Sequence, residues 1–135
     1  MANIHPFFSG IDVNGAANWT LEFLTNNVVS TTTNLSPKPN IIISEGNSVP
    51  PPTALMAVGW PTGSGSLNSS VAGIDELQYF INTFPAAATA AGVDYYWFEG
   101  YDEPWKIVYD TATEQYEDHW VYFCRCGANS RDYWM

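Results

Sequence analysis

The stretch Asn40-Ile41-Ile42-Ile43-Ser44-Glu45 decides the fold expected for this 135-residue chain. Three consecutive isoleucines favour an extended backbone, because side chains branched at Cβ pack well on a pleated surface. Apolar residues at successive positions indicate a strand covered on both faces, as in a parallel sheet. Glu45 ends this strand. A carboxylate there either takes part in chemistry at the end of a sheet or turns out to solvent, and the residues alone favour neither alternative.

Helical and extended patterns alternate along the rest of the chain. Residues 16–24 repeat apolar side chains at the spacing of a helix with one buried face, and residues 71–84 carry a longer pattern of the same kind. Gly92 is the expected end of this second helix. Residues 93–98, mostly apolar and aromatic, predict another strand. Strands that alternate with helices predict an α/β fold with a parallel sheet.

The remaining segments lack these patterns. Residues 25–39, rich in Thr and Asn, predict a loop, and residues 59–66, rich in Gly and Ser, predict another. Asn68 or Ser69 is the expected N-cap of the second helix. Residues 107–120 predict a partly helical segment.

Charge and composition narrow the classes of partner. Fourteen acids against four bases give a net charge of -10, which argues against nucleic acid and against anionic membrane surfaces. A neutral partner such as a polysaccharide fits, although acidity also simply keeps a protein soluble. Six Trp and eight Tyr suit the apolar faces of sugar rings, and they equally suit a packed core.

Cysteines and targeting segments give little information about function. Cys124 and Cys126 stand two residues apart, and no His or Cys cluster completes a metal site, so we expect no metal and no cofactor. The chain has no signal peptide and no apolar run long enough to span a bilayer. N-glycosylation acceptor patterns at Asn18, Asn34 and Asn68 indicate a secreted parent protein.

Three motifs in order resemble family 17 glycoside hydrolases, most closely the fungal cell-wall β-1,3-glucanases and glucanosyltransferases. They are residues 3–8, Ser44-Glu45 followed later by residues 58–61, and residues 98–106. The resemblance covers residues 2–120 apart from 46–57. It implies a (β/α)8 TIM barrel that acts on β-1,3-glucan by a retaining mechanism, in the cell wall or outside the cell.

The resemblance also assigns site residues. Glu45 matches the nucleophile, Glu103 and Lys106 match an acid and a base beside the catalytic centre, and Glu117 matches a further acidic position near substrate. The remaining matched positions would line the glucan cleft: His5, Phe7, Phe8, Trp60 and Tyr101. A retaining enzyme needs its nucleophile and a protonated acid ~5 Å apart. An ammonium such as Lys106 would help to keep the nucleophile ionised.

The chain lacks the motif that carries the catalytic acid in this family. The family carries this acid in an Asn-Glu motif, and no such motif occurs in the 135 residues. We therefore expect an incomplete barrel with about the last three βα units, and a polypeptide that is itself inactive. The alternative interpretation is a non-catalytic glucan-binding or wall-associated fragment.

Residues 46–57 interrupt the nucleophile motif and contain three consecutive prolines, which fit neither a helix nor a central strand. Removing them joins Ser44-Glu45 to Val58 and restores the family motif. Codons for Gly46-Asn47 and for Ala57-Val58 can carry splice sites, so we interpret the segment as a translated intron that cDNA would lack. The alternative is a genuine insertion in an active-site loop. Residues 1–120 then form the partial barrel domain, and residues 121–135 are an unassigned tail.

Overall fold

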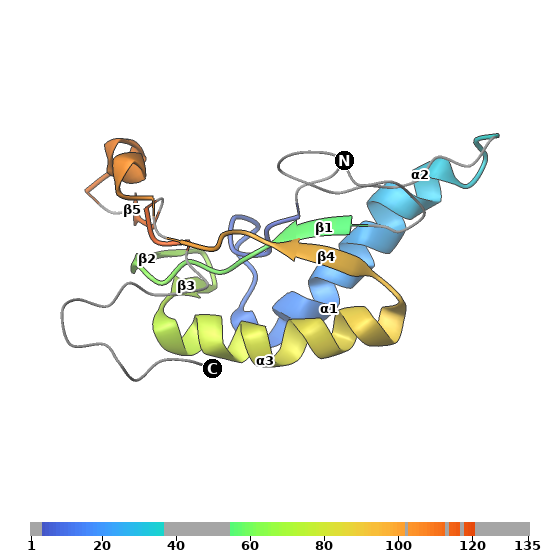
Figure 1. Cartoon of the computed structure of the whole chain (residues 1–135), viewed down its shortest axis with the longest axis horizontal. Helices are drawn as coiled ribbons and strands as arrows, with labels where there is room; N and C mark the ends of the chain where they lie inside the picture. Colours follow the sequence, from blue (N-terminus) through green and yellow to red (C-terminus); the bar gives the residue numbers. More distant parts are fainter. Residues whose placement is uncertain (1–3, 37–54, 102, 113, 117, 121–135) are drawn as a thin grey trace.

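The computed structural model describes residues 4–36, 55–101, 103–112, 114–116 and 118–120 (Figure 1). The isoleucine run, Glu45, Glu117 and both cysteines lie outside the described residues. The predictions that rest on them therefore stay predictions. Among the helices that are described, none is long and apolar enough to cross a membrane.

Two parallel strands form the centre of the described fold. β1 (Leu55–Val58) pairs with β4 (Asp94–Trp97), with Ala57 opposite Tyr96 and Val58 opposite Trp97. Helix α3 (Ile74–Ala91) precedes β4 and runs beneath the pair in Figure 1. Helix α1 (Val13–Phe23) packs against α3. Helices beside a parallel strand pair confirm the α/β class, and the strand predicted over residues 93–98 is confirmed.

β1 includes the last residues of the segment 46–57. The last three of these residues, 55–57, pair with β4 and so form part of the parallel sheet. The interpretation of residues 46–57 as an insert stays a prediction. Leu55 to Val58 is itself a short apolar run, and pairing satisfies the backbone polar groups on the edge that faces β4. Residues 46–54 lie outside the described part of the chain.

The first helix extends further than its apolar pattern predicts. Asp12 caps α1, accepting a hydrogen bond of 2.9 Å from the Asn14 backbone N–H, which lowers the pKa of its carboxyl. After Phe23 the chain continues as a π-helix, η1 (Leu24–Val29), and as α2 (Ser30–Thr32), where a loop is predicted. Hydroxyls there donate to carbonyls one turn earlier, as Thr25 does to Leu21 at 2.9 Å. The polar stretch therefore satisfies its own hydrogen bonds as a helix.

A β-hairpin replaces the predicted start of the second helix. β2 (Ser64–Leu67) and β3 (Ser70–Ala72) are antiparallel, and the turn between them contains Asn68 with φ of 54°. Asn tolerates this left-handed conformation better than most residues. Asn68 and Ser69 are thus turn residues, and Gly73 is the N-cap of α3. The predicted helix end is confirmed, since Gly92 caps α3 at φ of 65°.

The last described elements are short. η2 (Pro104–Tyr109) is a 3-10 helix, and β5 (Glu114–Gln115) pairs with β2 in an antiparallel register. The prediction of a partly helical segment after residue 107 is therefore correct only for the end of η2. Figure 1 shows η2 at the end of the molecule away from α2.

Aromatic rings fill the core. Phe80 of α3 is fully buried, and its ring centroid lies 5.6 Å from that of Trp60, 5.2 Å from Phe84 and 5.9 Å from Trp97. The Trp60 indole N–H donates to the Val71 carbonyl at 2.8 Å, which ties the core to β3. This cluster joins α3 to both the hairpin and β4, so it determines where the residues after β4 lie.

Candidate active site

A lysine held between two glutamates follows the C-terminal end of β4. Lys106 Nζ lies 2.9 Å from Glu99 Oε1 and 2.6 Å from Glu103 Oε2. The side chains of Lys106 and Glu99 are 15% and 17% exposed, whereas that of Glu103 is 35% exposed. Lys106 and Glu103 are two of the predicted site residues, and the structure brings them into direct contact.

Burial and pairing set the charges of this cluster. The hydrogen bond from Lys106 lowers the pKa of Glu103, so this carboxylate stays ionised. Burial raises the pKa of Glu99, although Lys106 opposes this effect. Burial by itself would lower the pKa of Lys106, but its hydrogen bonds to Glu103 and Glu99 raise it above the ordinary value of 10.5. At neutral pH the cluster therefore presents an ionised, partly exposed carboxylate, Glu103, beside the ammonium of Lys106.

Aromatic rings surround the ammonium. Lys106 Nζ lies 4.6 Å from the centroid of the Phe98 ring and 5.7 Å from that of Trp105. Phe98 in turn contacts His5, with centroids 6.0 Å apart, and Trp120, also at 6.0 Å. The ion cluster and His5 are thus joined through one ring.

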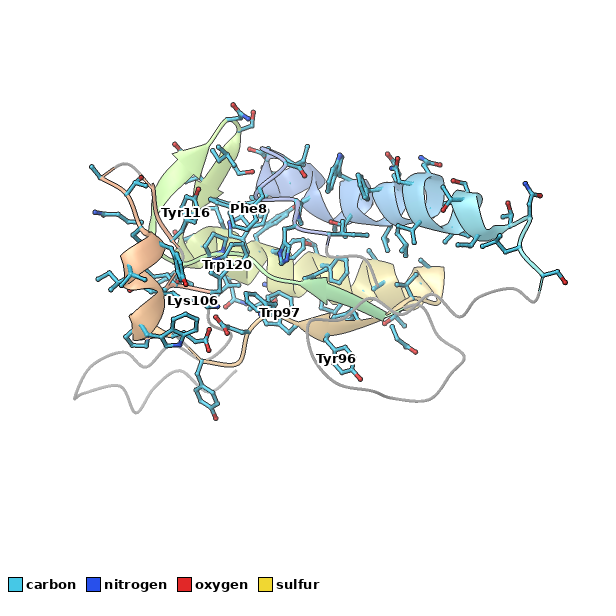
Figure 2. The ribbon with its side chains drawn as sticks, turned by 90° about the horizontal axis from the view of Figure 1, so that it is seen from above. Phe8, Tyr96, Trp97, Lys106, Tyr116 and Trp120 are labelled. Carbon is cyan, nitrogen blue, oxygen red and sulfur yellow. The ribbon has the colours of Figure 1, made fainter. Side chains whose placement is uncertain are left out.

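Phe8 extends this surface toward β5. Its ring is 43% exposed and lies 5.1 Å from Trp120, 5.8 Å from Tyr116 and 5.8 Å from His5. Figure 2 shows Phe8, Trp120 and Tyr116 close together, with Lys106 beyond Trp120. The structure therefore assembles four predicted site residues, His5, Phe8, Glu103 and Lys106, around Phe98 and Trp120.

Two predicted cleft residues take a different place. Phe7 and Trp60 are fully buried, and their ring centroids lie 5.5 Å apart in an edge-to-face contact. Phe7 also packs on Tyr116 and Trp120. These rings therefore belong to the core that carries the site. Burying their large apolar surfaces stabilises the fold more than exposing them at a cleft would. Tyr101 is 72% exposed.

Glu99 is the site residue that the sequence prediction omits. It follows β4 by two residues, and its backbone N–H donates to the Trp120 carbonyl at 2.8 Å. The signal in the sequence is a carboxylate directly after a strand, seven residues before Lys106. Glu45 and Glu117, predicted as nucleophile and as a further acid, lie outside the described residues.

The described residues offer hydrogen bonding and charge rather than metal chemistry. No group of three or more His, Cys, Asp or Glu side chains within them could hold a metal ion. An ionised carboxylate accepts hydroxyl hydrogens, an ammonium donates to oxygens, and exposed rings contact C–H faces. This combination suits a neutral polyhydroxylated ligand.

Replacing Lys106 by Met is expected to destabilise the chain at neutral pH, because Glu99 and Glu103 lose their shared cation. Since the folded pKa of Lys106 is raised, its contribution is complete below 10.5 and is lost as the pH rises through the folded value. Urea unfolding at pH 7 and at several pH values above 10.5 should therefore show a difference between the wild-type and Lys106→Met free energies that is constant up to 10.5 and decreases above it. The exposed neighbour Ile107, replaced by Met, should follow the wild type throughout. A difference that does not decrease at pH values above 10.5 would contradict the pairing.

Comparison with known proteins shows the family to which the chain belongs. Residues 1–120 match the model of the BtgE/BtgC glycoside hydrolase domain, so the chain belongs to that family of glycoside hydrolases. It is 42% identical over 131 residues to the probable glucan endo-1,3-beta-glucosidase btgC of Aspergillus terreus. It is 34% identical over 131 residues to the glucan endo-1,3-beta-glucosidase btgC of Emericella nidulans. Each match covers 89% of this chain and 18% of the relative, so the chain spans less than a fifth of their length.

Solved structures share the fold. The glycoside hydrolase family 17 beta-1,3-glucanosyltransferase from Rhizomucor miehei superposes with a TM-score of 0.65 at 18% identity. An active-site mutant of that enzyme, in complex with laminaritriose, gives 0.63 at 21% identity. Both matches cover 88% of this chain and 36% of the solved chain. The described elements therefore have the arrangement of part of such an enzyme.

Proposed function

We propose that this chain is part of a glycoside hydrolase that acts on β-1,3-glucan by a retaining mechanism. The observation that carries the proposal is the Lys106 ammonium held between Glu99 and Glu103 beside exposed rings, within residues that match a glycoside hydrolase family. The names of the relatives, glucan endo-1,3-beta-glucosidases, support the substrate class.

In this proposal the chain supplies about the last three βα units of an incomplete (β/α)8 barrel. The parallel pairing of β1 and β4, with α3 between them in sequence, is the unit from which such barrels are built. The proposed site lies after the C-terminal end of β4, the end at which barrel enzymes carry their active sites. The domain division stays part of the proposal: residues 1–120 form the partial barrel, residues 46–57 are an insert whose last three residues pair in β1, and residues 121–135 are a tail.

The residues take separate roles. Glu103, ionised and partly exposed, would accept hydrogen bonds from sugar hydroxyls, and Phe8 would contact the C–H face of a sugar ring. Glu45 remains the proposed nucleophile and Glu117 a proposed supporting acid. The fixed ammonium of Lys106 would favour an ionised carboxylate near it.

We propose further that the longer protein is secreted or located in the cell wall. Asn18, Asn34 and Asn68, the three possible glycan acceptors, are all exposed in the structure, which supports this location.

Binding to insoluble β-1,3-glucan tests the proposal directly. We expect the chain to be retained on this polymer and to pass through cellulose, whose β-1,4 linkages present a different shape. Glu103→Gln should weaken retention by about tenfold, since a hydrogen bond to a charged group contributes roughly 1.5–3 kcal/mol. Tyr79→Ala, which removes an exposed ring from α3, is the control and should bind as the wild type. Equal retention on both polymers would overturn the proposed specificity.

The second candidate function is binding without catalysis. It is favoured by one observation, that the 135 residues contain no Asn-Glu motif to supply the acid. Retention on the glucan without release of sugar by the longer protein that contains this chain would favour this function, whereas release of sugar by that protein would favour hydrolysis.

A further inference from the structure

The two carboxylates that pair with Lys106 are attached to different parts of the fold. Glu103 precedes η2 directly, and the Lys106 backbone N–H donates to the Glu103 carbonyl at 2.8 Å. These two residues therefore share one helical turn, and their ion pair is local to that turn. This pair by itself cannot fix where the turn lies relative to the sheet.

Glu99 is attached to the sheet instead. The Phe98 backbone N–H donates to the Val58 carbonyl at 2.7 Å, which continues the pairing of β4 with β1. The next N–H, that of Glu99, donates to the Trp120 carbonyl at 2.8 Å. Consecutive hydrogen bonds to two other segments leave the backbone of Glu99 little freedom.

The backbone at Phe98 is closely packed against the chain that follows β1. A Cβ added at Gly59 would clash with the Phe98 carbonyl oxygen, so the chain after β1 touches the chain after β4. The Phe98 ring also covers the Lys106 ammonium, with 4.6 Å between Nζ and the ring centroid. Glu99 and Phe98 together hold the Lys106 ammonium in a fixed position at the end of the strand pair.

We propose that Glu99 is a positioning residue, which fixes the Lys106 ammonium, and with it the partly exposed Glu103 carboxylate, relative to the ends of β1 and β4. This role rests on the proposed function, because the group that it positions is a proposed contact of the sugar. The Glu99–Lys106 ion pair spans seven residues and links η2 to the sheet, whereas the Glu103–Lys106 pair lies within a single turn.

The burial of the two carboxylates agrees with this division. Glu99 is 17% exposed and Glu103 is 35% exposed, so a ligand reaches Glu103 more readily. Burial raises the pKa of Glu99, which is the direction expected for a carboxylate that works inside the fold. Pairing lowers the pKa of Glu103, which suits a group that stays ionised at the surface.

Lysine side-chain NMR tests the positioning role without any sugar. The chain contains only two lysines, Lys38 and Lys106, so selectively labelled lysine gives two sets of signals, and Lys38→Arg assigns them. In the wild type we expect nuclear Overhauser contacts between the Lys106 side chain and the Phe98 ring. Glu99→Gln should lose these contacts, whereas Glu103→Gln should keep them. Asp75→Asn, which removes an exposed charge in the first turn of α3, should leave them unchanged.

Laminaritriose affinity, measured by titration calorimetry on the same variants, connects the position of the ammonium with binding. We expect Glu99→Gln to weaken binding by about tenfold. Amide spectra that match those of the wild type, apart from signals of residues near the substitution, show that each variant is folded. Contacts that survive in Glu99→Gln, or that disappear in Glu103→Gln, would overturn the positioning role. If the wild type does not bind laminaritriose, the proposed function fails, and the NMR contacts still decide the role of Glu99.

Discussion

Laminarin incubated with this chain is expected to release no reducing sugar above background. A retaining mechanism needs a protonated carboxylic acid at the leaving oxygen, and the 135 residues contain no Asn-Glu motif to supply it. General acid catalysis by itself contributes roughly 10²–10⁴-fold to such a reaction. The loss should therefore be large enough to place any activity below detection in an ordinary reducing-sugar assay.

The variant Glu45→Gln provides the control for this result. It removes the proposed nucleophile, so its signal should equal that of the unaltered chain if neither polypeptide is active. Robust turnover that disappears in Glu45→Gln would show that another group of the chain acts as the acid.

Replacing Phe80 by Ala should have the largest effect on stability. The ring is fully buried and contacts Trp60, Phe84 and Trp97, so its removal leaves a cavity between α3, the hairpin and β4. Truncating a buried Phe to Ala costs about 3–5 kcal/mol. Domains of this size are typically stable by only about 5–15 kcal/mol, so the variant should be close to unfolding. Urea denaturation followed by circular dichroism measures the loss.

Tyr79→Ala is the matched control, since Tyr79 is the preceding residue of the same helix and is 40% exposed. This variant loses an aromatic ring and gains the same alanine without opening a core cavity. Its free energy of unfolding should stay within about 0.5 kcal/mol of the wild type, as is usual for surface positions. Equal losses in the two variants would mean that Phe80 is not central to the core.

The elements that sequence patterns predicted correctly are those whose own residues carry the signal. Residues 16–24 and the end of the second helix at Gly92 follow from apolar spacing and from the conformational freedom of glycine. Residues 93–98 follow from their apolar and aromatic run. Such local signals need no knowledge of the rest of the fold.

The hairpin at residues 64–72 depends on partners far along the chain. The Trp60 indole N–H holds the Val71 carbonyl, and the Ser70 hydroxyl donates to the Ile11 carbonyl at 2.7 Å. Serines and glycines carry little strand preference of their own, so tertiary contacts select the extended form. The helical course of residues 25–32 was missed for a related reason, since the hydroxyl hydrogen bonds that support it form only once the helix exists.

The candidate site also contains residues that the sequence predicted and residues that it did not. Motif resemblance predicted Glu103 and Lys106, which the structure brings into contact. It could not tell that Phe7 and Trp60 face the core, because an aromatic side chain suits either a cleft or a core. Glu99 escaped prediction because its partner lies seven residues away, across a turn whose course the sequence does not reveal.

The two-stranded parallel sheet has a consequence for how the isolated chain behaves in solution. Within the described residues β1 pairs with β4 alone, and the sheet of an incomplete barrel, as proposed above, does not close on itself and can accept a strand of another chain. Mutual repulsion between chains that each carry a net charge of -10 opposes such pairing near neutral pH. This repulsion weakens as the pH falls toward the isoelectric point of about 4.1, or as salt screens it. Acidic or concentrated salt solutions should therefore favour aggregation through the edges of this sheet, while dilute neutral buffers keep the chain dispersed.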